Sequence, residues 1–304
     1  MGEKKGLKLV LLTAVISGVS IFINKFGVEG INPYVFTFSK NLVVLLFLFS
    51  AILLFKKFGQ LKKLRAKEWV KLAVIGFLGG SIPFLLFFKG LSMTSGATAS
   101  FIHKTMFVYV IFFAAVFLKE KINKKVLAGT VILLLGNFLL LKLNNLAFNT
   151  GDLLILCATL FWAVENTVSK HALKTIHSTT VAFGRMFFGS FFILAFLIMS
   201  GNMKHMATLT IGQVLWAAFT SAFLFLYVLT WYSGLKHVKV SVATSVLLLG
   251  SPITTLLSFT FLNTAISISQ LTGILLIPAG IFFVLVGYQP WKDVLVWGEK
   301  HGWS

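Results

Sequence analysis

The stretch SGVSIFINK (residues 17–25) decides the fold, because it returns 145 positions later as WAVENTVSK (residues 162–170). Each copy is an apolar helical pattern with scattered polar residues that ends in a lysine. A second basic residue follows 15 positions after that lysine, Lys40 in the first copy and Arg185 in the second. Three glycines return at an offset of 144, with Gly90, Gly129 and Gly136 matched by Gly234, Gly273 and Gly280. The chain is therefore built of two related halves.

The composition places both halves in a membrane. The 304 residues are 58% apolar and 12% charged, with a mean hydropathy of +0.94, which lies outside the range of soluble proteins. The net charge of +19 comes from basic residues between apolar runs, so we expect a lipid bilayer and no nucleic acid as partner. Runs of about 20 apolar residues predict ten transmembrane helices, at residues 8–26, 33–55, 69–89, 97–118, 125–143, 151–170, 179–200, 212–232, 240–262 and 269–288.

Lysine and arginine predict the orientation. With a cytoplasmic N-terminus, 20 basic residues fall on the cytoplasmic side, 3 outside and 4 within spans. We therefore expect a multi-pass protein of the cytoplasmic membrane with both termini in the cytoplasm. Five helices per copy is an odd number, so the second copy enters from the opposite side. The expected fold is an all-α polytopic membrane protein of two inverted five-helix repeats, residues 1–145 and 146–290, with a short cytoplasmic tail at 291–304.

Polar residues on one helical face predict a substrate site between the halves. The span 151–170 carries them at spacings of i, i+3, i+4 and i+7, as Trp162, Glu165, Asn166 and Ser169. Subtracting 145 places Ser17, Ser20 and Asn24 on the matching face of the first helix. Polar side chains are costly in lipid, so both faces should line a cavity near the middle of the membrane.

Glu165 is the one acidic residue that we place inside a span. It is a candidate coupling carboxylate or a counter-charge for a substrate amine. The alternative is a structural ion pair with one of the basic residues within the spans, Lys25, Lys40, Lys104 or Arg185.

The fourth predicted helix carries a second unusual feature, because His103 and Lys104 lie well inside it. Their counterparts in the second half are Leu247 and Leu248, so this feature breaks the repeat. We expect both residues to contact substrate. The alternative is that Lys104 snorkels to the outer membrane surface and His103 is a hydrogen-bonded core residue.

Lys40 and Arg185 are matched in the two halves, which favours gating or scaffold use over substrate contact. Lys25 and Lys170 end their helices, where attraction to the helix dipole is a sufficient explanation. Trp231 and Tyr232 end the eighth predicted helix, a position typical of interface anchors. The repeated glycines of the fifth and tenth helices favour close helix packing, and Pro83 and Pro252 predict kinks.

Several chemistries lack their motifs. The sequence has no phosphate-binding Gly-rich loop, no His-Glu-x-x-His and no Gly-x-Ser-x-Gly, so we expect no cofactor, no metal site and no catalytic residues. An intramembrane enzyme is the alternative from another class, but Glu165 has no second carboxylate to work with.

Together, the lysines that close helices 1 and 6, the basic residues early in helices 2 and 7 and the glycine-rich third to fifth helices resemble the drug/metabolite transporter superfamily, and its EamA-type branch most. The sequence departs from that pattern in the second half, where the counterpart of Lys119-Glu120 is Asn263-Thr264, so only one of the two glutamates is present. The resemblance implies a secondary transporter that works by alternating access.

Charges of both signs and Trp162 favour an amino acid or related compound as substrate, with export as the expected direction. The alternative is an organophosphate or organic-anion exchanger, since the sugar-phosphate branch binds phosphate through basic residues in helices 4 and 9. A proton is the candidate coupling ion, and we expect a monomer or homodimer.

Overall fold

The computed structural model describes residues 2–27, 31–94, 96–140 and 148–288, and these are helical with no strand. The first half contains α1 (Glu3–Gly27), α2 (Pro33–Leu54), α3 (Phe58–Lys62), α4 (Ala66–Ile75), the π-helical segment η1 (Gly76–Ser81), α5 (Ile82–Leu91), α6 (Gly96–Lys104), α7 (Met106–Phe117) and α8 (Lys124–Leu139). The second half contains α9 (Thr150–Ala172), α10 (Ser178–Met199), the 3-10 segment η2 (Asn202–Met206), α11 (Ile211–Leu235), α12 (Val240–Leu247), α13 (Gly250–Leu262) and α14 (Ile268–Tyr288).

These segments confirm the predicted all-helical membrane fold. Among the described residues, eight helical stretches are long and apolar enough to cross a membrane. The other two predicted spans are α6–α7, which is interrupted at Thr105, and α8, which has 16 residues. The predicted tail 291–304 and the boundary between residues 145 and 146 lie outside the described residues.

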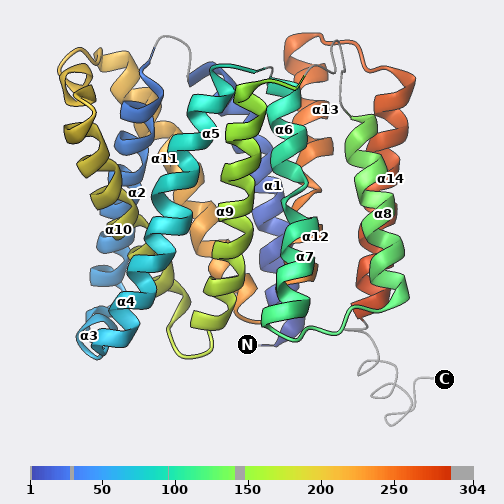
Figure 1. Cartoon of the computed structure of the whole chain (residues 1–304), viewed down its shortest axis with the longest axis horizontal. Helices are drawn as coiled ribbons and strands as arrows, with labels where there is room; N and C mark the ends of the chain where they lie inside the picture. The colour runs from blue at the N-terminus through green and yellow to red at the C-terminus, as the bar shows by residue number, and fades with distance from the viewer. Residues whose placement is uncertain (1, 28–30, 95, 141–147, 289–304) are drawn as a thin grey trace.

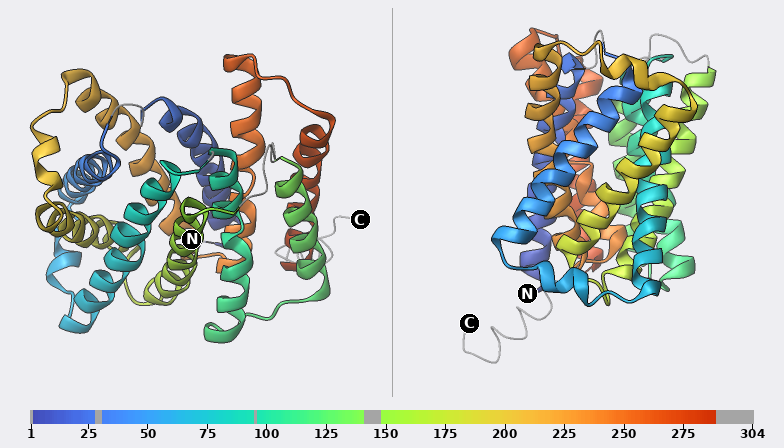
Figure 2. Two further views of the ribbon diagram at one scale, coloured as in Figure 1. Left: turned by 45° about the horizontal axis from the view of Figure 1, so that its top comes forward. Right: turned by 90° about the vertical axis from the view of Figure 1, so that its left-hand side faces the viewer.

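The two halves run in opposite directions through the bundle. In Figure 1, α1 begins at the end of the bundle that holds the N-terminus, whereas α9 begins at the opposite end. Pairings repeat accordingly: α1 packs on α11, and α9 packs on α5. The pairs α8–α14 and α2–α10 join equivalent helices at the two sides of the bundle. Figure 2 shows that the short α3 lies across the N-terminal end.

Glycine allows α8 and α14 to meet closely, as the repeated spacing predicts. A Cβ atom at Gly129 would lie 2.8 Å from the carbonyl oxygen of Gly280, and one at Gly273 would lie 2.7 Å from that of Gly136. Real Cβ atoms do not approach backbone oxygens so closely, so larger residues would push the helices apart.

The predicted fourth and ninth spans each contain an irregular turn, near Thr105 and near Leu248, while Val240–Leu262 as a whole is long and apolar enough to cross a membrane. The N–H of Thr105 is shared between the carbonyls three and four residues back, and the N–H groups of Val108 and Leu248 bond to carbonyls three residues back, which tightens both turns. Lys119 and Asn263, also 144 positions apart, both have a left-handed backbone, with φ of 54° and 51°. The repeat therefore extends to backbone irregularities.

Candidate functional site

A cavity of about 630 Å³ lies between the two halves. It reaches the end of the bundle away from the N-terminus, where Leu91 ends α5 and Thr264 precedes α14. The cavity lining includes Ser20 and every predicted site, coupling and gating residue except Ser169, namely Ser17, Asn24, Lys40, His103, Lys104, Trp162, Glu165, Asn166 and Arg185. Ser169 does not line it and instead lies one helical turn beyond Glu165, to which it donates a hydrogen bond.

Glu165 is held by hydroxyl groups. Its Oε1 atom accepts hydrogen bonds from Ser169 Oγ at 2.5 Å and from the Tyr232 hydroxyl at 2.7 Å. The hydrogen bonds that Lys40 and Arg185 donate go to other groups, so neither forms a hydrogen-bonded ion pair with Glu165, although the Arg185 guanidinium does interact with Glu165 electrostatically. Glu165 is 1% exposed, which makes it a buried acid beside the cavity.

Tyr232 and Trp231 overturn the expectation that they anchor α11 at the membrane interface. Both are fully buried, and Trp231 Nε1 donates to Asn166 Oδ1 at 3.0 Å. The reason is that α11 packs along α1 and α2, so its C-terminal turns lie inside the bundle. A tyrosine near a helix end gives no sequence signal that separates this site residue from an interface anchor.

The π-helical segment η1 presents backbone carbonyls to the site. Gly79 O accepts from Trp162 Nε1 at 3.0 Å and from Arg185 Nη2 at 2.9 Å. Pro83, predicted to kink this helix, has no N–H to donate to the carbonyl of Gly79 four residues earlier. The kink therefore leaves acceptor capacity for the Arg185 guanidinium, which also lies over the rings of Phe84 and Tyr232 at 5.8 and 6.0 Å.

Asn41 is a polar cavity residue that the sequence analysis missed. Its Nδ2 atom donates to Gly80 O at 2.8 Å, and its buried Oδ1 atom has no hydrogen-bond partner among the described residues. The available signal was a polar amide directly after Lys40 within an apolar span.

The first half contains an equivalent hydrogen-bonded cluster that has no carboxylate. Lys40 Nζ donates to Asn24 Oδ1 at 2.7 Å, and Asn24 Nδ2 donates to Ser20 Oγ at 3.1 Å. The Asn24–Ser20 bond and the Ser169–Glu165 bond join residues related by the same offset of 145. Lys40 and Arg185, the basic residues matched by the repeat, therefore each donate a hydrogen bond to an oxygen in the cavity wall. Lys40 Nζ also lies 5.1 Å from the centre of the Phe36 ring.

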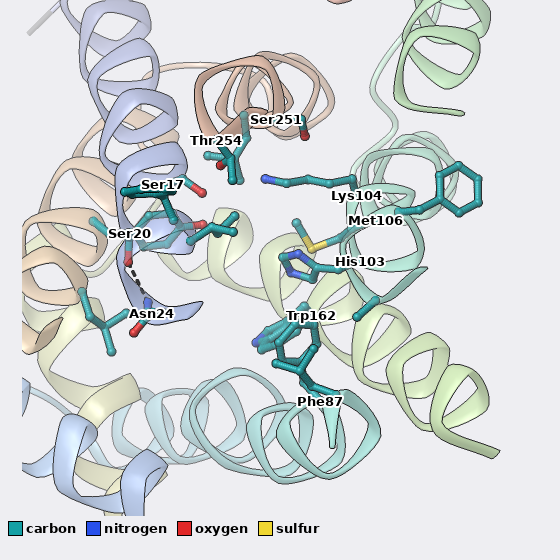
Figure 3. Close-up of a pocket in the computed structure, with 18 of the residues that line it drawn as sticks. Ser17, Ser20, Asn24, Phe87, His103, Lys104, Met106, Trp162, Ser251 and Thr254 are labelled. Atoms are coloured by element: carbon teal, nitrogen blue, oxygen red, sulfur yellow. Dashed lines mark hydrogen bonds between the residues drawn. The ribbon is translucent and has the colours of Figure 1, made fainter. Parts of the chain in front are cut away.

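Lys104 projects into the cavity from the last turn of α6 (Figure 3). Its side chain extends towards Ser251 and Thr254, and it has no hydrogen-bond or ion-pair partner among the residues that the structure describes. It is 4% exposed, which argues against snorkelling to the membrane surface. His103 instead lies against aromatic rings, 4.9 Å from Trp162 and 5.4 Å from Phe87 between ring centroids.

The charges on the cavity wall are unbalanced. Within the described residues, the lining contains the cations Lys40, Lys104 and Arg185 and one carboxylate, Glu165. Lys40 and Arg185 bond to neutral oxygens, and Lys104 has no hydrogen-bond or ion-pair partner within the described ranges. Such a wall attracts an anionic group. No cluster of three or more His, Cys, Asp or Glu side chains that could hold a metal ion occurs in this part of the chain.

Comparisons with known proteins agree with this architecture. An uncharacterized transporter of Archaeoglobus fulgidus is 29% identical over 256 residues, which cover 82% of this chain and 86% of that protein. The uncharacterized transporter YyaM of Bacillus subtilis is 24% identical over 237 residues, 74% of each chain. A solved crystal structure shares the fold, with a TM-score of 0.79 at 16% identity over 96% of this chain and 100% of that one. The profile of the EamA-like transporter family matches residues 4–142 and 149–286, so the chain belongs to this family of the drug/metabolite transporter superfamily and is a transporter, not an enzyme.

Proposed function

We propose that this protein is a secondary active transporter that exports a small, carboxylate-bearing polar metabolite, an amino acid or related compound, across the cytoplasmic membrane. The observation that carries the proposal is the Lys104 ammonium, which is buried in the cavity without a protein anion. A buried charge without a partner is costly. A substrate carboxylate would supply that partner, with the hydroxyls of Ser251 and Thr254 on the facing helix.

The size and lining of the cavity support a small substrate. A volume of about 630 Å³ is in the range of sites that enclose one small molecule. Trp162, Phe87 and His103 form an aromatic wall beside Lys104, and we propose that the apolar part of the substrate packs there. Ser17, Asn24 and Asn166 then provide neutral hydrogen-bonding groups around it.

The inverted halves support alternating access. The described residues that line the cavity extend to the end of the bundle away from the N-terminus, and the helix pairs on the two sides are related by the repeat. Exchange of the conformations of the two halves would close that end and open the other. With cytoplasmic termini, as the lysine distribution predicts, this conformation faces outward.

Glu165 is proposed as the coupling group and Lys40 and Arg185 as gating residues. Glu165 is a buried acid in the wall of the cavity that also holds the proposed substrate site. Protonation of Glu165 would change the charge of that cavity, so proton binding and substrate binding would weaken each other. Arg185 connects to it through Tyr232, whose ring it covers and whose hydroxyl donates to Glu165.

An organophosphate or organic-anion exchanger is the second candidate. The excess of two cations over the single carboxylate on the cavity wall favours a substrate with net negative charge. The repeat relates His103 to Leu247, which lies on α12 and is not basic. The absence of a second basic group at this position favours a substrate with one carboxylate over a substrate with a phosphate.

A thermal-shift screen of the purified protein tests these candidates. Zwitterionic amino acids, dicarboxylates and hexose phosphates would be compared, because a ligand stabilises the state that it binds. Lys104→Met should abolish the shift and reduce vesicle uptake at least tenfold, whereas the exposed Lys89→Met on α5 should change neither. Equal effects of the two substitutions would remove Lys104 from the site.

A further inference from the structure

The end of the bundle near the N-terminus is closed by a charged contact that the cavity does not explain. Glu120 follows α7 and reaches the first turn of α12. Its carboxylate accepts from the N–H of Val240 at 3.0 Å, from the N–H of Ser241 at 3.4 Å and from Ser241 Oγ at 2.5 Å. The first N–H groups of a helix carry partial positive charge and lack intrahelical partners. Glu120 therefore attaches the end of α7 to the start of α12.

A basic side chain holds the preceding turn. Lys170, at the end of α9, donates to Leu235 O at 2.7 Å and to Val238 O at 2.6 Å. These carbonyls end α11 and lead into α12, so the hydrogen bonds of Lys170 stabilise the end of a neighbouring helix, whereas the sequence analysis expected an effect on the end of α9 itself. The connection between α11 and α12 is thus held by an acid from the first half and a base from the second.

The repeat identifies the matching position at the open end. An offset of 144 relates Glu120 to Thr264 and relates Val240, the first residue of α12, to Gly96, the first residue of α6. The residues before them, Lys119 and Asn263, share the left-handed backbone described above, so both chain segments turn in the same way. Thr264, however, lines the open cavity in this structure.

We propose that Glu120 is a positioning residue for the transport cycle, namely the latch that keeps the N-terminal end shut. In the opposite conformation, Thr264 takes the equivalent place over the first turn of α6 while Glu120 releases α12. Hydrogen bonds to a carboxylate are roughly twice as strong as those between neutral groups. The Glu120 latch therefore outweighs its neutral counterpart, and the resting protein favours the conformation that is open away from the N-terminus. The latch rests on the alternating access proposed above.

Two cysteine reporters test the latch in the full-length protein with Cys157→Ser. Ala243→Cys places a thiol in the buried part of α12, and Ser258→Cys places one on the cavity wall. Labelling rates with a water-soluble maleimide then report the two ends separately. Glu120→Gln should raise labelling of the Ala243→Cys thiol about tenfold and lower that of the Ser258→Cys thiol, since loss of about 1.4 kcal/mol is a tenfold change in equilibrium.

Thr264→Glu is the second test variant. It adds a carboxylate that could hold the first turn of α6, and it leaves the contact between Glu120 and α12 in place. It should shift both reporters in the same direction as Glu120→Gln, an effect that simple loss of a structural contact would not produce. Glu68→Gln is the matched control: this half-buried carboxylate accepts from the N–H of Arg65 at 2.9 Å at the start of α4, and its loss should leave both rates unchanged.

The latch is wrong if either Glu120→Gln or Thr264→Glu leaves both labelling rates at the parent values while the purified variant stays folded and monodisperse. Vesicle transport by the parent protein separates the two proposals. Transport with unaltered labelling in the variants rejects the latch alone, whereas shifted labelling without transport of any tested metabolite supports the latch and rejects the proposed substrate class.

Discussion

Glu165→Gln should uncouple transport from a proton gradient without unfolding the protein. Glu165 is the single carboxylate among the described residues that line the cavity, so it can carry at most one proton per cycle. A gradient of one pH unit is worth about 1.36 kcal/mol for one proton, which corresponds to about tenfold substrate accumulation. Glutamine retains an oxygen to accept from Ser169 and Tyr232, so the packing around the site should persist.

The assay uses proteoliposomes and the metabolite identified by thermal shift. The parent protein should concentrate substrate about tenfold per pH unit, whereas Glu165→Gln should only equilibrate it while still exchanging labelled for unlabelled substrate. Glu68→Gln, which removes a half-buried carboxylate that does not line the cavity, should behave as the parent. Accumulation by Glu165→Gln at the parent level would refute the coupling role.

Two further predictions address packing and pH. Gly280→Val should lower the free energy of unfolding by about 1–3 kcal/mol, because a Cβ atom there would lie 3.0 Å from Gly129 O. Ala279→Val, on the adjacent exposed position, should leave the thermal unfolding midpoint unchanged. Burial first, and then nearby lysines, lower the pKa of His177, which caps α10 by accepting from the N–H of Thr179 at 3.4 Å. Because the unfolded state binds the proton more readily, stability should fall as the pH drops through about 6.5; His177→Asn should flatten that dependence in thermal melts at pH 5 and 8, and an equal slope would contradict it.

The repeat predicted the fold well because each of its signals is local. Apolar length defines a span, and a constant offset of 144 or 145 between glycines and basic residues relates the halves. The matching face of α9 was also predictable, since i, i+3, i+4 spacing places Trp162, Glu165 and Asn166 together whatever surrounds the helix.

Tertiary contacts decide what the sequence could not predict. No proline or glycine marks the break at Thr105, where the backbone tightens within an apolar run. Tyr232 lies near a helix end like many interface anchors, and only the packing of α11 against α1 and α2 reveals its contact with Glu165. The carbonyl of Gly79 becomes a site group because Arg185 and Trp162 approach it from other helices.

The duplicated hydrogen bond shows where the two halves differ at the site, because one half has an acid where the other has a hydroxyl. Asn24 donates to Ser20 in α1, and the related Ser169 donates to Glu165 in α9. If both pairs were identical, exchange of the two halves would recreate the same site facing the other way, and a proton would have equal affinity for both conformations. A ligand shifts the balance between two conformations only if its affinity for them differs. Under the coupling role proposed for Glu165, a carboxylate in one copy of the duplicated site would let protonation shift that balance, since the environment of Glu165 then differs between the conformations while the scaffold remains symmetric.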